Sequence, residues 1–184
     1  MKATGIVRRI DDLGRVVIPK EIRRTMRIRE GDPLEIYTNR DGEVIFKKYS
    51  PIGEINSFAS QYVEALYRTC NMEVIICDRD AVIAAAGVPK KEYLERHISS
   101  DLEGIMEGRS FYRCREGEKS VYPIDDNPSR IVSCAMPIIT EGDVIGCVVS
   151  LSMVGKERKS DEMQDVEQKL ISTAASFLGK QMES

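Results

Sequence analysis

The most constraining feature of this sequence is how closely chain-breaking residues follow one another near its amino terminus. Two short runs rich in β-branched residues, 6–10 and 15–18, flank the polar segment Asp11-Asp12-Leu13-Gly14. Because glycine adopts positive φ readily, this segment predicts a turn between two strands. Pro19 ends the second run, and a proline is tolerated in the first turn of a helix, so residues 20–26 are predicted to be helical.

A second hairpin is predicted after this helix. Gly31-Asp32-Pro33 interrupts the chain, and residues 34–39 and 43–48 alternate in polarity on either side of Arg40-Asp41-Gly42, a typical hairpin turn. Four short strands and one short helix cannot close a core in 50 residues, and an isolated hairpin is barely stable in water. The sequence therefore predicts that residues 1–50 associate with a second chain.

The charge of this segment differs from that of the rest of the chain. Residues 1–50 carry 12 Lys and Arg against 8 Asp and Glu, whereas the remainder carries 15 against 22. A guanidinium group is well shaped for bidentate hydrogen bonds to phosphate or to guanine. A basic module on an acidic chain predicts binding of a polyanion, and the alternative is a solvated basic face without a partner. The clustered cations are Arg8, Arg9, Arg15, Lys20, Arg23, Arg24, Arg27 and Arg29.

The segments 4–24, 32–37 and 42–49 closely resemble the AbrB-type transition-state regulators. In that family, two chains interlace their hairpins into one swapped-hairpin β-barrel, with one short helix per chain, that binds DNA through arginines. The resemblance implies a homodimer that binds double-stranded promoter DNA. Strand alternation turns Arg9 away from Arg8, so Arg9 is a weaker candidate, as are Lys20, Arg27 and Arg29. The matching family positions are Arg8, Arg15, Arg23 and Arg24.

The remaining chain predicts a second domain. Pro51 and Gly53 mark a linker, residues 51–55, between a DNA-binding domain at 1–50 and a domain at 56–184. Apolar residues at helical spacing predict helices at 54–69 and from the capping Ser160 to the terminus. Together with the intervening strands, they predict an α+β domain with an antiparallel sheet flanked by helices. The strand-like runs are 73–77, 81–86, 121–124, 131–139 and 144–151.

The middle of this domain gives weaker signals. Residues 92–96 and 101–107 are predicted to be short helices, and residues 109–118 are polar, without a predicted element. The five cysteines form no Cys-x-x-Cys pair and are predicted to be small buried hydrophobes. No phosphate-binding glycine loop, metal-ligand cluster or nucleophile beside a base is found, and His97 is the only histidine. The sequence therefore predicts no metal site, no cofactor and no enzymatic activity.

The order of elements in the second domain is similar to that of a GAF-type sensor domain. Residues 76–80, 137–138, 142–149 and 177–183 are also similar to AbrB-family regulators of sporulation genes that carry such a domain. This resemblance implies a homotetramer, associated through the carboxy-terminal helices, that activates or represses transcription. No apolar run approaches 18 residues and no signal peptide begins the chain, which predicts a cytoplasmic protein. Two alternatives stay open: a small-molecule sensor whose output is DNA binding, and an antitoxin-type module.

Overall fold

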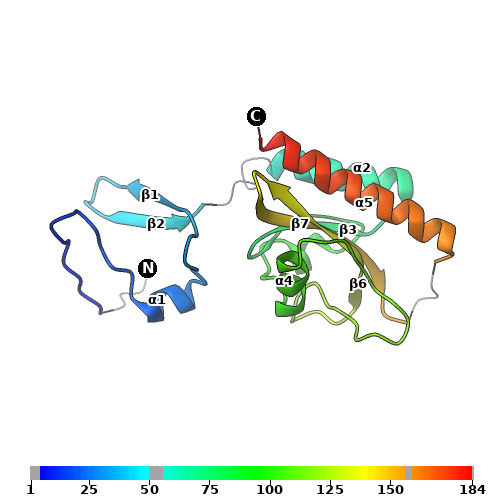
Figure 1. Ribbon diagram of the computed structural model, residues 1–184, viewed down its shortest axis with the longest axis horizontal. Helices are drawn as coiled ribbons and strands as arrows, with labels where there is room; N and C mark the ends of the chain where they lie inside the picture. The colour runs from blue at the N-terminus through cyan, green and yellow to red at the C-terminus, as the bar shows by residue number, and fades with distance from the viewer. Residues whose placement is uncertain (1–4, 50–55, 156–158, 184) are drawn as a thin grey trace. The chain divides into compact units, whose positions relative to one another are not determined.

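The computed structural model describes residues 5–49, 56–155 and 159–183. The chain divides into two compact units, Met1–Tyr49 and Ser50–Ser184, which we call the amino-terminal and carboxy-terminal units (Figure 1). The linker predicted at 51–55 lies outside the described residues. No helix in the described ranges is both long enough and apolar enough to cross a lipid bilayer.

The amino-terminal unit contains one short helix and one β-hairpin. Helix α1 (Lys20–Thr25) follows Pro19, and strands β1 (Leu34–Thr38) and β2 (Val44–Lys48) pair antiparallel. Gly42 has a φ of +79°, a backbone conformation that is costly for a residue with a side chain. Its N–H donates to the carbonyl of Asn39 at 3.3 Å. The predicted second hairpin is therefore confirmed, and the predicted helix ends one residue early.

The first predicted hairpin forms only its turn. The Asp11 N–H donates to the Arg15 carbonyl at 3.0 Å, and the Gly14 N–H donates to the Asp11 carbonyl at 3.0 Å. Within the described ranges, however, neither 6–10 nor 15–18 is a strand. The strand prediction is therefore wrong for the single chain, in which the two runs are joined, among the described residues, only by the hydrogen bonds of the turn between them.

The amino-terminal unit has almost no core of its own. Among its described residues, only Pro19 is buried. Val7 is 84% exposed and Leu13 is 71% exposed, although both are large and apolar. The other large apolar side chains left exposed are those of Ile6, Ile10, Val16, Val17, Met26, Ile36, Tyr37, Val44, Phe46 and Tyr49.

The carboxy-terminal unit is a five-stranded antiparallel sheet covered by helices on both faces. Its strand order is β4-β3-β7-β6-β5, and every neighbouring pair is antiparallel, which confirms the antiparallel sheet predicted for an α+β domain. The strands are β3 (Val74–Asp78), β4 (Val82–Ala86), β5 (Tyr112–Arg113), β6 (Arg130–Thr140) and β7 (Asp143–Met153). The helices are α2 (Asn56–Cys70), α3 (Lys90–Tyr93), α4 (Ser100–Glu107) and α5 (Asp161–Gln181).

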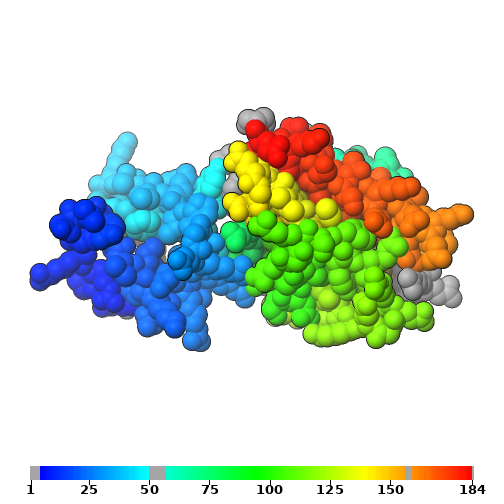
Figure 2. Space-filling model, viewed as in Figure 1, coloured from blue at the N-terminus to red at the C-terminus, as the bar shows by residue number. Residues whose placement is uncertain are grey.

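Strand alternation divides the core into two layers. Val74 and Ile76 of β3 pack toward α2 and α5, whereas Ile75 and Cys77 pack toward α3 and α4. Helix α5, orange to red in Figure 2, forms a continuous part of the surface of this unit. Gly179 allows α5 to approach β6 closely, because a Cβ atom there would lie 2.5 Å from the carbonyl oxygen of Ile139.

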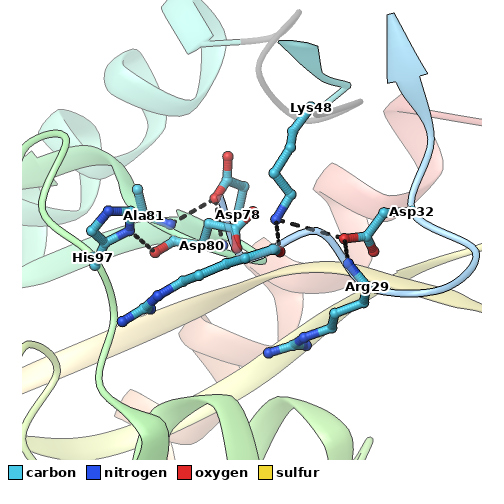
Figure 3. A network of polar contacts seen from close by, with 8 residues as sticks. Arg29, Asp32, Lys48, Asp78, Asp80, Ala81 and His97 are labelled. Carbon is cyan, nitrogen blue, oxygen red and sulfur yellow. Dashed lines mark hydrogen bonds and ion pairs between the residues drawn. The ribbon is translucent and has the colours of Figure 1, made fainter. Parts of the chain in front are cut away.

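Polar contacts fix the turn between β3 and β4 (Figure 3). The Asp78 carboxylate accepts hydrogen bonds from the N–H groups of Asp80 and Ala81, both at 2.8 Å. His97 Nδ1 lies 3.3 Å from the Asp80 carbonyl oxygen, and His97 pairs with Ala81 in an isolated bridge. The contacts of this histidine are therefore those of a residue that supports a turn.

Three local predictions are wrong. Residues 121–124 form no strand, because Pro123 has no N–H to donate and Ile124 is buried in the α3–α4 layer. Helix α3 lies at Lys90–Tyr93 rather than 92–96, since Leu94 is extended and Glu95 has a φ of +63°. The segment 109–118 contains β5, whose two residues pair with β6.

The cysteines match their prediction only in part. Cys77, Cys134 and Cys147 are buried, whereas Cys70 is exposed and Cys114 is half-buried, and all five are free thiols. Cys70 is exposed because it is the last residue of α2, and Cys114 follows the edge strand β5. Burial raises the pKa of the Cys134 and Cys147 thiols, which disfavours the reactive thiolate form.

Candidate nucleic-acid interface

The predicted DNA-binding residues lie on two parts of the amino-terminal unit, and all six side chains are exposed. Arg8, Arg9 and Arg15 belong to the segment before α1, and Lys20, Arg23 and Arg24 belong to α1 itself. Among the described residues, the side chains of Arg9, Lys20, Arg23 and Arg24 make no hydrogen bond or ion pair. Their cationic groups are therefore available to an anion.

Arg15 is held in place by Asp11. One carboxylate oxygen of Asp11 accepts from the N–H groups of Leu13, at 3.1 Å, and Arg15, at 2.7 Å. The other oxygen accepts from Arg15 Nε at 2.8 Å. The Arg15 N–H, followed by its guanidinium, holds the pKa of Asp11 below its usual range. The aspartate therefore fixes both the turn and the Nε atom of the Arg15 guanidinium group.

This arrangement leaves the far edge of Arg15 accessible. The ion pair uses Nε, and the Arg15 side chain is still 70% exposed. The two terminal nitrogens of an arginine can bind two acceptors at once, as on a guanine edge or a phosphate. Asp11 was not predicted as a site residue, although an aspartate four residues before an arginine across a tight turn is a recognisable signal.

Helix α1 presents Arg23 and Arg24 at its last turn. The helix ends in a Schellman arrangement, in which the Ile28 N–H donates to the Arg23 carbonyl at 2.7 Å and the Arg27 N–H donates to the Arg24 carbonyl at 3.3 Å. Arg27 adopts a φ of +50° at the position where glycine is favoured. This cap satisfies carbonyl groups at the helix end and fixes where α1 stops.

A buried contact ties the end of the hairpin to the loop that follows α1 (Figure 3). Lys48 Nζ donates to the Arg27 carbonyl at 2.8 Å and lies 3.6 Å from the Asp32 carboxylate, which also accepts from the Arg29 N–H at 2.8 Å. The Asp32 side chain is only 6% exposed. Lys48 therefore acts within the fold, unlike the exposed cations of α1.

Two known protein families match separate parts of the chain. Residues 54–183 match the family described as stage V sporulation protein T C-terminal, transcription factor. Residues 7–54 match the family described as antidote-toxin recognition MazE, bacterial antitoxin. Stage V sporulation protein T of Bacillus subtilis (strain 168) is 54% identical over 184 residues, which cover 100% of this chain and 99% of the relative.

Two solved structures resemble the two units separately. The solution structure of the N-terminal DNA recognition domain of Bacillus subtilis AbrB is 63% identical, covers 28% of this chain and 94% of its own, and has a TM-score of 0.25. The crystal structure of the A. aeolicus nlh2 GAF domain, in an inactive state, is 13% identical, covers 70% of this chain and 89% of its own, and has a TM-score of 0.51.

The last of these likenesses shows that the carboxy-terminal unit has the GAF fold. The family match spans most of the chain, and the identity to the Bacillus subtilis protein extends from end to end. The chain therefore belongs to the stage V sporulation protein T family of transcription factors.

Proposed function

We propose that this chain is a sequence-specific DNA-binding regulator of sporulation genes, and that it is not an enzyme. The observation that carries the proposal is the set of cations on α1 that are exposed and, among the described residues, unpaired. Arg15, which precedes α1 in the sequence and which Asp11 holds in place, adds to this set. These groups suit the phosphates and base edges of promoter DNA. Membership of a transcription-factor family supports the same conclusion.

The DNA-binding form is a homodimer of amino-terminal units. A unit whose large apolar side chains are mostly exposed cannot be stable alone, and a second copy would bury them while supplying partners for strands at 6–10 and 15–18. Two interlaced chains would bring two copies of each arginine to one DNA-binding surface. The functional division is then a DNA-binding domain at 1–50, a linker at 51–55 and a GAF-like domain at 56–184.

The carboxy-terminal units join these dimers into a tetramer. Apolar side chains on the outer surfaces of α2 and α5 support this assembly, since Met163 is 58% exposed and Val166 is 56% exposed, with Phe58 and Tyr67 also exposed. Sedimentation of the intact chain, with and without promoter DNA, tests the stoichiometry. A monomer that binds DNA with full affinity would contradict both levels of assembly.

The test of DNA binding is the affinity of the full chain for a promoter fragment. The triple variant Arg15→Ala, Arg23→Ala, Arg24→Ala should bind at least about a hundredfold more weakly than the parent, because each chain can then form fewer charge-assisted hydrogen bonds to DNA. The matched control is Arg40→Ala, which removes an exposed charge at the tip of the β1–β2 hairpin. Equal affinities of the triple variant and the parent would refute the proposal.

Two other functions make different predictions. The MazE match at residues 7–54 favours an antitoxin. In an antitoxin, however, this module is followed by a tail that wraps the toxin, whereas here it is followed by a folded unit. A ligand sensor whose output is DNA binding is favoured by a cavity in the carboxy-terminal unit. A ligand that changes promoter affinity would support the sensor.

A further inference from the structure

A cavity of about 410 Å³ lies on the face of the carboxy-terminal sheet that α2 and α5 cover, where β6 begins and β7 ends. Its walls come from the end of α2, from β5 with the residues after it, and from the first turns of α5. This volume is typical of sites for small metabolites. The segments that form it are distant in sequence, so no local pattern predicts it.

The floor of the cavity is polar and irregular. Residues Val132 and Cys134 of β6 face Leu151 and Ser150 of β7, so the intervening Ser133 is the extra residue of a β-bulge. Ser133 and Ser152 both line the cavity. Bulges redirect side chains and are common beside binding sites, and here the bulge lies at the cavity floor.

One wall carries a buried carboxylate. Glu167 of α5 is only 4% exposed, and its Oε1 accepts a hydrogen bond from Ser150 and lies 2.7 Å from Lys159 Nζ. Its Oε2 makes no hydrogen bond within the described ranges. Taking a charged group out of water is costly unless it is well partnered. The second oxygen is therefore suited to a cationic group in the cavity.

A second wall carries an anchored guanidinium. Arg113 of β5 donates from Nη2 to the Gln164 carbonyl at 3.1 Å and to Gln168 Oε1 at 2.6 Å, and the same nitrogen lies 3.5 Å from the Asp165 carboxylate. Its Nε and Nη1 have no hydrogen-bond partner among the residues that the structure describes. These two nitrogens are therefore able to donate to an anionic group.

Other charged side chains also line the cavity. Arg115 and Glu116 line the cavity with opposite charges, and the carboxylate of Glu73 is already paired with Arg130 at 2.7 Å. Arg113 and Glu167 are therefore charged groups of the lining that other side chains hold in place and that each keep, within the described part of the chain, an unpartnered atom for a ligand.

We propose that this cavity binds a free α-amino acid. Arg113 would bind the carboxylate, and Glu167 Oε2, with the serine hydroxyl groups of the floor, would accept from the ammonium group. The opposite charges on two walls match the two charges of a zwitterion, and the volume leaves room for a side chain. This site goes beyond the proposed DNA-binding function and does not depend on it.

The first experiment titrates the full chain with each proteinogenic amino acid, by calorimetry and thermal shift. At least one should bind and raise Tm with concentration. Its α-keto acid, which lacks the ammonium group, and its amine, which lacks the carboxylate, should each bind at least about tenfold more weakly. Binding of no amino acid, or equal binding of either analogue, would overturn the proposal.

Variants then place the ligand in this cavity. Arg113→Gln and Ser152→Leu, which would fill the floor, should each weaken binding at least about tenfold, whereas Lys119→Gln, at an exposed ion pair with Asp101, should not. Using two variants protects the test against one that misfolds. Unchanged binding in both would overturn the assignment. Promoter affinity measured on the same preparations separates this failure from failure of the DNA-binding proposal.

Discussion

The replacement Arg15→Lys tests whether this residue reads DNA sequence or only supplies charge. The pair with Asp11 uses Arg15 Nε and leaves the two terminal nitrogens accessible. Lysine keeps the positive charge but has a single ammonium group, which cannot bind two acceptors in a fixed plane. The variant should therefore lose base recognition and keep most of its attraction to phosphate.

The size of the effect follows from the bidentate geometry. One bidentate pair of hydrogen bonds to guanine is worth about 1–3 kcal/mol of discrimination, which corresponds to roughly fivefold to 150-fold in affinity for each guanine that lysine no longer recognises. Affinity for unrelated DNA, and the dependence of that affinity on salt, should change little. The assay is fluorescence anisotropy with a promoter fragment and a shuffled fragment of the same length.

Two companion variants sharpen this test. Asp11→Asn keeps the shape of the turn residue but removes the charge that holds the guanidinium, so it should lower the ratio of specific to non-specific affinity in the same direction. Arg40→Lys, at the tip of the other hairpin, should leave that ratio unchanged. If Arg15→Lys binds the promoter as tightly as the parent does, the inference that Arg15 reads bases is wrong.

Three further predictions concern the fold. Gly179→Ala places a methyl group 2.5 Å from the Ile139 carbonyl oxygen, so it should destabilise the carboxy-terminal unit by about 1–3 kcal/mol and lower its Tm, and an unchanged Tm would contradict the close approach of α5 to β6. Desolvation raises the pKa of Tyr112 to about 12, so the unfolded chain releases this proton first and stability should fall as pH rises from about 10 to 12. Tyrosinate absorbance should show a late-titrating group that Tyr112→Phe removes. Amide exchange in residues 7–10 and 16–18 should slow as the protein concentration rises, because the dimer would supply hydrogen-bond partners for their backbone, and exchange independent of concentration would exclude that pairing.

Local signals were sufficient where an element depends on its own residues. The turn at Arg40-Asp41-Gly42 and the long helix that begins after Ser160 were both predicted, because a glycine at positive φ and a capping hydroxyl group act within a few residues. Strands β6 and β7 were also predicted, since each is a long apolar run. The antiparallel pairing of β3 with β4 and of β6 with β7 follows from the short turns that join them.

The sequence was insufficient where a structure depends on distant residues. Strand β5 has only two residues and exists because β6 pairs with it. The strands predicted at 6–10 and 15–18 show the opposite case. Their local sequence pattern is typical of strands, but the described part of the single chain supplies no neighbouring strand with which they form a ladder of hydrogen bonds. Arg113 and Glu167 were likewise missed, because only the folded sheet brings them to one cavity.

The same contrast applies to the candidate interface. Charge asymmetry and the family resemblance selected Arg8, Arg15, Arg23 and Arg24 from the sequence, and the structure leaves all of them exposed. The spacing of Asp11 and Arg15 across a tight turn is a signal in the sequence, but a turn aspartate is common, and only the fold shows that its carboxylate accepts from Arg15 Nε.

The most direct test of DNA binding by the clustered arginines is the salt dependence of promoter affinity for the parent and for the double variant Arg23→Ala, Arg24→Ala. If about six phosphates are neutralised by a dimer, the logarithm of affinity should fall against the logarithm of salt concentration with a slope of roughly −5, and the double variant should bring the slope to roughly −2. A flat response in the parent, or the same slope in both proteins, would contradict the account.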